Sequence, residues 1–422
     1  MLPPDHPQRL ILANEVHARP PEAVETPSRA AYVALLVERS ERARELEHLS
    51  ALCRQYSALP PLADATHFSV QLGSIRLKWE RHGEFSSFTV LASGASRTPF
   101  AEPVTALLPP GWLAGLPGST IVAAHAELIA DEPLQAAGAL QQAFGSHLVV
   151  GAEVGDRAAL TYTDFRVHGD GFARFLIIDR SLTPRQAGRT LQRLFEIEAY
   201  RVLALLALPI AQRYSPRTLA IEQELSELTD RIAADGGDDE TLLQALTRLA
   251  AEVESGIAAS QFRFNACRAY HQLVLTRIAE LREQRLAGIQ TIEEFMARRL
   301  TPAVATCATV AQRLHDLSER VAQASALLST RVDITRERQN QALLASMDRR
   351  AKQQLRLQQT VEGLSVAAIV YYVAGLVGYV AKAGKAGGLP VSPDLFVGLA
   401  IPVIAVFVIY ALRRARHALH DD

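Results

Sequence analysis

Two long apolar runs lie near the C-terminal end of the chain. Residues 364–381 (LSVAAIVYYVAGLVGYVA) and 395–412 (LFVGLAIPVIAVFVIYAL) contain no charged side chain. A helix of about 18 residues is about 27 Å long, which matches the hydrocarbon core of a bilayer. The pattern predicts two transmembrane helices, and the glycines and prolines of residues 382–394 predict a short, irregular loop between them.

Basic side chains lie mainly before the first apolar run and after the second. Cytoplasmic segments carry the excess of lysine and arginine, so we expect both termini in the cytoplasm and the loop on the far side. The N-terminal residues show no basic segment followed by an apolar one, and so predict no secretory signal. We therefore predict a two-span protein of the cell inner membrane, whose partner is the lipid bilayer and whose residues 413–422 form a basic cytoplasmic tail. The charges in question are Arg349, Arg350, Lys352 and Arg356 before the first run, Lys382 and Lys385 in the loop, and Arg413, Arg414 and Arg416 after the second.

The region before the apolar runs has helical periodicity. We expect a helical domain over residues 181–300, beginning at Thr183-Pro184, a typical helix start, and interrupted at Pro209. Thr301-Pro302 predicts the start of a long stalk helix over residues 301–363 that continues into the first apolar run. Apolar residues alternate by four and three in this helix, which is typical of a coiled coil and predicts a homo-oligomer. They are Val310, Leu314, Leu317, Val321, Ala324 and Leu328.

Residues 1–180 show a different pattern, which predicts an α+β domain with a largely antiparallel sheet. Apolar and polar residues alternate in several short runs separated by glycine-containing turns. We expect helices over residues 28–56 and 133–144. The expected strands are residues 67–72, 75–80, 85–92, 120–129, 147–153, 158–167 and 172–178.

Charge and motifs narrow the classes of function. The formal net charge of −1 gives no electrostatic case for nucleic acid. Nucleotide fingerprints and the common hydrolase and protease motifs are missing from the sequence, so we expect no cofactor and no enzyme. The three cysteines, Cys53, Cys267 and Cys307, lie far apart and are expected to be reduced, partly buried thiols.

Two short clusters of charged residues and histidine are weak candidates for a ligand or metal site. In an extended segment, Glu15, His17 and Arg19 would point to one side and could bind an anion. The alternative is a structural, hydrogen-bonded segment. The second cluster, Glu80, His82 and Glu84, spans a predicted hairpin turn and could bind a divalent ion, although solvated charges are the usual content of such a turn. The run His168-Gly169-Asp170-Gly171 is interpreted as another hairpin turn.

Four runs together resemble a family of uncharacterised bacterial proteins that are anchored in the membrane. They are residues 14–20 (NEVHARP), 79–88 (WERHGEFSSF), 191–211 and 364–379, so the resemblance covers essentially the whole chain. This resemblance implies the identity of the family and implies no activity.

The order of the predicted elements also resembles the CorA-type magnesium channels. These channels combine a cytoplasmic α/β domain with a long helix that enters the first of two spans, and form pentamers around a pore. Their Gly-Met-Asn signature at the end of the first span is missing, because residues 375–381 read GLVGYVA. The loop also has two lysines and one acid, Asp394, whereas CorA-type loops favour acids.

Two functional hypotheses follow, and a third is weaker. The first is a CorA-like channel or transporter, with a divalent cation as its possible cargo. Small and polar residues of the first span would then line a pore or contact a neighbouring helix. The second is a non-conducting membrane scaffold or ligand sensor with a cytoplasmic binding domain. A tethered enzyme would require the two charged clusters to converge in one cleft. The pore-lining or helix-contact candidates are Ser365, Tyr372, Gly375, Gly378 and Tyr379.

Overall fold

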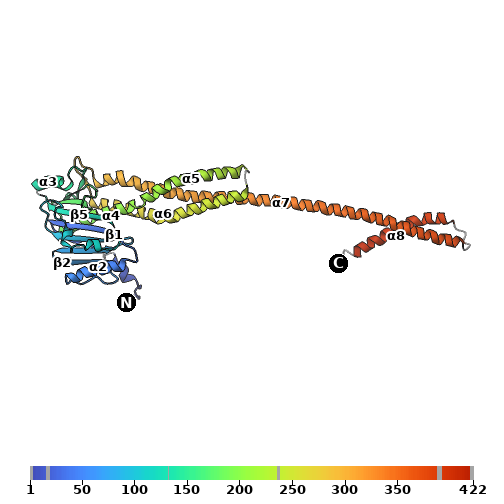
Figure 1. The fold of residues 1–422 in the computed structure, drawn as a ribbon, viewed down its shortest axis with the longest axis horizontal. Helices are drawn as coiled ribbons and strands as arrows, with labels where there is room; N and C mark the ends of the chain where they lie inside the picture. The colour runs from blue at the N-terminus through green and yellow to red at the C-terminus, as the bar shows by residue number, and fades with distance from the viewer. Residues whose placement is uncertain (1–2, 16–19, 132, 235–237, 387–391, 419–422) are drawn as a thin grey trace. The chain divides into compact units, whose positions relative to one another are not determined.

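The protein forms two compact units, Met1–Ser325 and Ala326–Asp422, in a computed structural model (Figure 1). The structure describes residues 3–15, 20–131, 133–234, 238–386 and 392–418. The first unit combines a β-sheet with helices, and the second contains only helix among its described residues. The predicted α+β class with long C-terminal helices is confirmed.

The first unit is built on a nine-stranded sheet with the order β2-β3-β4-β1-β5-β8-β7-β6-β9. All neighbouring strands are antiparallel except β5 and β8, which pair in parallel. The strands are β1 (Ser28–Leu36), β2 (His67–Leu72), β3 (Ile75–Arg81), β4 (Phe85–Ser93), β5 (Ser119–Ala130), β6 (Val150–Val154), β7 (Ala159–Thr163), β8 (Ala173–Asp179) and β9 (Gln284–Arg285).

Helices cover both faces of the sheet. On one face, α4 (Pro184–Leu205) packs its apolar side against β1, β5 and β8, and α6 (Asp239–Leu281) shares the same core. On the other face, α2 (Arg42–Gln55) covers β1, β3 and β4, and α3 (Pro133–Phe144) covers the half formed by β5, β7 and β8. Shorter elements are α1 (Arg9–Glu15) and the 3-10 turns η1 (Val104–Leu107) and η2 (Leu113–Gly115).

The central strand β1 corrects one prediction. Residues 28–56 were expected to form a single helix, but residues 28–36 form β1 and only Arg42–Gln55 is helical. Tyr32 and Ala34 face the core beneath α4, whereas Val33 and Leu35 face the core beneath α2. A strand that is buried on both faces is apolar at every position, so it lacks the alternation that distinguishes a strand from a helix.

The helices after the sheet also differ from the prediction at their ends. Leu206 and Ala207 separate α4 from α5 (Leu208–Ala233), and Pro209 therefore lies in the first turn of α5. The next long helix begins at Ile292, so Thr301-Pro302 lies inside α7 (Ile292–Ala386) and does not start it. The predicted continuity of this helix into the first apolar run is confirmed.

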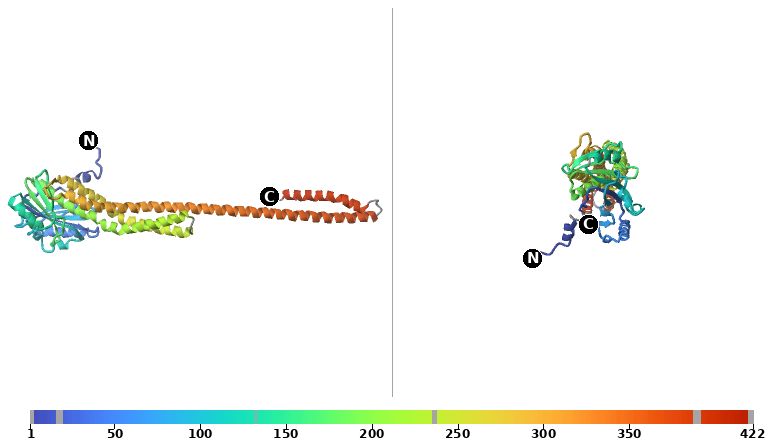
Figure 2. Two further views of the ribbon diagram at one scale, coloured as in Figure 1. Left: turned by 90° about the horizontal axis from the view of Figure 1, so that it is seen from above. Right: turned by 90° about the vertical axis from the view of Figure 1, so that its left-hand side faces the viewer.

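The spaced apolar residues of α7 pack against other helices of the first unit. Helices α5 and α6 and the first part of α7 lie side by side (Figures 1 and 2). A Cβ atom at Gly256 of α6 would lie 3.1 Å from Tyr214 of α5 and 3.4 Å from Leu314 of α7, so the three helices meet there. The spaced apolar side chains from Val310 to Ala324 are all buried in the isolated chain. They pack a three-helix bundle, and the pattern alone gives no evidence for a second copy.

The second unit contains the end of α7 and α8 (Pro393–Ala418), which runs back alongside it (Figure 2). Both helices are long and apolar enough to cross a membrane. In the most apolar window of each, only 6% of the residues are buried. These helices therefore differ from the core helices of the first unit, whose apolar faces are covered.

Candidate functional site

Strand β3 places two opposite charges inside the first unit. Side chains alternate along a strand, so Lys78 and Glu80 share the face that looks toward α4, while Leu77 and Trp79 face the core under α2. The Lys78 Nζ atom lies 3.0 Å from Glu80 Oε1, and each side chain is only 9% exposed. A buried ion pair gains little net stability because both charges must be desolvated. The pair is therefore a candidate for a role in binding, because other polar side chains surround it.

Helix α4 closes the pocket from the opposite side. Gln192 Nε2 donates a hydrogen bond to Glu196 Oε1 at 2.7 Å, which fixes the orientation of the amide. The other oxygen of Glu196 pairs with Arg277 of α6. Gln192 Oε1 is buried and has no hydrogen-bond partner within the described part of the chain. A residue that lines the pocket therefore carries a buried acceptor without a donor.

Residues 20–25, which we call the strap, cover part of this pocket. Lys78 Nζ donates to the carbonyl oxygen of Pro20 at 3.1 Å, and Glu22 pairs with Arg76 at 2.8 Å. The backbone N–H of Val24 donates to the carbonyl of Pro184 at 3.0 Å, at the start of α4. The strap is therefore held against both walls. Thr183 and Gln186 form a capping box that fixes the first turn of α4 beneath it.

We refer to the space between β3, β4, α4 and the strap as the polar pocket. It is a small cavity, with a volume of about 40 Å³. Burial raises the pKa of both Tyr32 and Tyr200, which line it, so both hydroxyl groups stay neutral and can donate or accept hydrogen bonds. The polar side chains that line it are Glu22, Tyr32, Lys78, Glu80, His82, Ser87, Thr89, Gln192, Glu196 and Tyr200.

The structure separates the three members of the predicted Glu80–His82–Glu84 metal cluster. Glu80 pairs with Lys78, and His82 stacks on Phe85 with ring centroids 4.1 Å apart. Glu84 pairs with Arg263 of α6 at 2.6 Å. Among the described residues, these three do not form a group with ligand atoms close enough to share one ion. Glu80 and His82 instead become part of the polar pocket.

The other predicted cluster falls mostly outside the described residues. Residues 16–19 lie there, and with them His17 and Arg19. Glu15 is the last residue of α1. Pro20 follows this run directly, and its carbonyl accepts the bond from Lys78.

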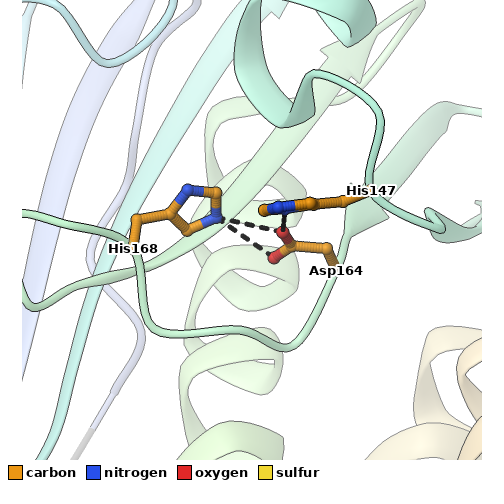
Figure 3. A group of neighbouring side chains, drawn as sticks. All are labelled: His147, Asp164 and His168. Atoms are coloured by element: carbon orange, nitrogen blue, oxygen red, sulfur yellow. Dashed lines mark hydrogen bonds and ion pairs between the residues drawn. The ribbon is translucent and has the colours of Figure 1, made fainter.

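A second group of side chains was not predicted. His147 Nδ1 lies 2.7 Å from Asp164 Oδ2, and His168 Nε2 lies 3.0 Å from the same oxygen (Figure 3). The Asp164 side chain is fully buried, whereas those of His147 and His168 are 38% and 10% exposed. We call this group the His–Asp–His cluster. Within the described part of the chain, it is the one set of three residues whose ligand atoms could surround a metal ion.

Two loops position the His–Asp–His cluster. His147 follows α3, Asp164 follows β7 directly, and His168 lies in the β7–β8 connection. Asp164 Oδ1 accepts the backbone N–H of Arg166 at 3.2 Å, and His168 is held by a hydrogen bond from its N–H to the Phe172 carbonyl at 3.0 Å. The predicted turn at residues 168–171 is present, but sequence spacing gave no sign that its histidine meets His147.

The sequence matches a known protein-family model over nearly its full length. The model described as a protein of unknown function, DUF3422, matches residues 4–419. The chain belongs to the DUF3422 family. The resemblance to an uncharacterised family is thereby confirmed. A comparison of this DUF3422 member with curated proteins found no match.

In this DUF3422 member, the candidates in the first apolar run lie on α7. Tyr372, Gly375, Gly378 and Tyr379 line a gap between α7 and α8 together with Lys382 and Asp394. A Cβ atom at Gly378 would lie 3.3 Å from Val397, so the two helices approach closely there. The Ser365 hydroxyl donates within its own helix, to the carbonyl of Val361 at 2.9 Å.

Proposed function

We propose that this chain is an integral membrane protein that binds a small polar ligand in its N-terminal unit. The two apolar helices would anchor it in the bilayer, and the polar pocket would hold the ligand. This corresponds to the sensor or scaffold hypothesis. The observation that carries the proposal is the contrast between the two units: the first buries charged and polar groups around a pocket, and the second exposes two long uncharged helical segments.

The exposure of the two apolar helices supports the anchor. Large apolar side chains are mostly uncovered, including Leu376 at 65%, Val380 at 72% and Phe407 at 71%. Soluble proteins rarely expose a continuous apolar surface of this kind, because burial of apolar area stabilises by about 25 cal/mol per Å². A bilayer provides that burial. Alkaline carbonate extraction should leave the chain in the membrane pellet; its release into the supernatant would contradict the anchor.

The chemistry of the polar pocket supports a ligand with a hydrogen-bond donor. Gln192 Oε1 needs a donor, and the buried pair of Lys78 and Glu80 offers one charge of each sign. A ligand that carries polar groups would replace the water at the mouth of the pocket. A purely apolar ligand would leave Gln192 Oε1 without a donor, which costs about 1–3 kcal/mol.

A ligand screen on the full-length protein in detergent tests this proposal. Both tryptophans of the chain, Trp79 and Trp112, are buried in the first unit, so their fluorescence follows its unfolding. A ligand at 100 times its Kd should stabilise the folded state by about 2.7 kcal/mol. Gln192→Leu should abolish the stabilisation, whereas Gln142→Leu, at an exposed position of α3, should retain it. A hit that stabilises both variants equally would refute this assignment of the pocket.

A CorA-like channel or transporter is the second candidate. The observation that favours it is the continuity of α7, which begins in the core of the first unit and includes the first apolar window. Magnesium flux into liposomes that contain the purified protein would support it, and absence of flux for any common cation would leave the anchor as the role of these helices.

A CorA-like channel would also have to be a homo-oligomer. Apolar side chains of α7 outside the bundle are exposed, including Leu343 at 60%, Met347 at 58% and Leu357 at 66%. A second copy could cover them. The mass of the detergent-solubilised particle, measured by light scattering with correction for detergent, would decide between one copy and several.

A further inference from the structure

We propose that the His–Asp–His cluster binds a divalent transition-metal ion, with Zn²⁺ as the best match. We further propose that the bound ion and a neighbouring group of arginines together bind an oxyanion. This site lies apart from the polar pocket and shares none of its lining residues.

The donor set matches zinc in kind and in spacing. Zinc is bound by imidazole nitrogen and carboxylate oxygen at about 2.0–2.2 Å, so donors at two corners of a tetrahedron lie about 3.3 Å apart. The Asp164 oxygens lie 2.7 Å from His147 Nδ1 and 3.0–3.3 Å from His168 Nε2. All the ligand atoms lie within 4.8 Å of one another. Small side-chain rotations of His147, which is partly exposed, would complete the geometry.

Three protein ligands leave one position of a tetrahedral ion open. Structural zinc sites use four protein ligands, whereas sites that exchange a ligand or perform catalysis use three. The backbone at the cluster is also strained, because Phe165 adopts a φ of +52° directly after Asp164. Phe165 is held there by stacking on Phe295, with centroids 5.0 Å apart, and by the Arg201 guanidinium 5.3 Å from its ring. Local strain of this kind clusters at functional sites.

Asp164 lines a second pocket of about 370 Å³, which we call the arginine-lined pocket. Arg166, Arg201 and Arg299 line it, and Asp164 is its one acidic residue among the described lining residues. Arg201 is paired with Glu198 at 3.0 Å. Arg166 and Arg299 are exposed, and their side chains have no hydrogen-bond or ion-pair partner within the described ranges.

The positive charge of the arginine-lined pocket favours an anionic ligand. Guanidinium groups bind carboxylate and phosphate oxygens through paired hydrogen bonds. A divalent ion at the cluster would add positive charge beside them and offer its open position to an oxygen of the same anion. Apolar neighbours such as Leu205, Phe295 and Leu300 would exclude water from one side. The chemical class of the ligand is therefore an oxyanion of the phosphate or carboxylate type.

Metal titration of the full-length protein in detergent, after treatment with a chelator, tests the metal half. The expected result is one Zn²⁺ per chain and, with Co²⁺ as a probe, the strong visible absorption of a tetrahedral site. His168→Ala and His147→Ala should weaken Zn²⁺ binding at least about 100-fold, since removing a direct ligand costs more than removing its supporting partner. His67→Ala, at an exposed histidine of β2, is the matched control and should bind normally.

Folding of the variants is checked by tryptophan fluorescence. His147 is the more exposed ligand, so its replacement should leave the first unit folded even if another variant does not. Zn²⁺ affinity that is equal in wild type, folded His147→Ala and His67→Ala would overturn the metal site.

Inorganic phosphate tests the oxyanion half. Phosphate should change the Co²⁺ absorption of the wild type, because it would replace water at the open position. Arg299→Gln should weaken this response at least about tenfold while Zn²⁺ affinity stays the same. A Co²⁺ spectrum that does not respond to phosphate or to acetate would overturn the oxyanion assignment.

Discussion

The substitution Gly188→Ala, in the wall of the polar pocket, should have two opposing effects on the stability of the first unit. Gly188 lies inside α4, where replacing glycine with alanine normally stabilises a helix by about 1 kcal/mol. The structure gives the opposite expectation. A Cβ atom at this position would overlap the carbonyl oxygen of Glu22 in the strap and lie 2.9 Å from the carbonyl carbon. Both of these atoms are backbone, so no side-chain rotation relieves the overlap.

The magnitude follows from what the strap would lose by moving away. It would give up the hydrogen bond from Val24 N–H to Pro184, worth about 0.5–1.5 kcal/mol. It would also expose part of Val24, which is only 6% exposed and whose full burial contributes about 1.5–3 kcal/mol. After subtraction of the helix gain of about 1 kcal/mol, we expect a net destabilisation of up to about 3 kcal/mol, together with weaker binding of any polar-pocket ligand.

Urea unfolding of the full-length protein, followed by tryptophan fluorescence, measures this effect on the first unit. Gly138→Ala in α3 is the matched control, because a Cβ atom there meets nothing within 4 Å. It should be stabilising by up to about 1 kcal/mol. If Gly188→Ala stabilises the unit as much as Gly138→Ala does, the close contact between strap and α4 is wrong.

Three further predictions concern other parts of the first unit. Burial lowers the pKa of His125 to about 4 from 6.5, so the folded state binds this proton less readily than the unfolded state. Stability should therefore fall as pH decreases from about 6.5 to 4, by about 3 kcal/mol in total, and His125→Asn should remove that part of the pH dependence of the urea midpoint. Leu314→Ala should cost about 2–5 kcal/mol at any protein concentration, whereas a cost that changes with concentration would place Leu314 between copies. Glu45→Leu should cost about 1–3 kcal/mol in the same assay, because Glu45 is fully buried and accepts from Trp79 Nε1 at 3.1 Å, and Glu45→Gln should cost less.

Parts of the fold were predictable where one face of an element is covered and the other is not. The alternation of residues 75–80 identified strand β3 and placed Lys78 and Glu80 on the same face. It could not show that α4 lies over this face, because the partner comes from a distant part of the chain. Charges in a hairpin are usually solvated, and here the covering helix turns them into the lining of a pocket.

Other features depend on tertiary contacts that leave no local pattern. The spaced apolar residues from Val310 to Ala324 have the same spacing whether their partner is a second copy or α5 and α6 of the same chain. The His–Asp–His cluster joins side chains from two loops, and none of the pairwise spacings matches a metal motif. Asp164 could be recognised only after the sheet had placed the end of β7 beside the loop that follows α3.

Labelling of single introduced cysteines tests the membrane arrangement most directly. The native cysteines are buried, so an impermeant maleimide should report only the introduced one. Lys385→Cys, between the two apolar helices, should be labelled in right-side-out vesicles and protected in inside-out vesicles. Arg97→Cys, on the surface of the first unit, should show the reverse. Labelling of both positions from the same side would contradict a pair of helices that spans the bilayer.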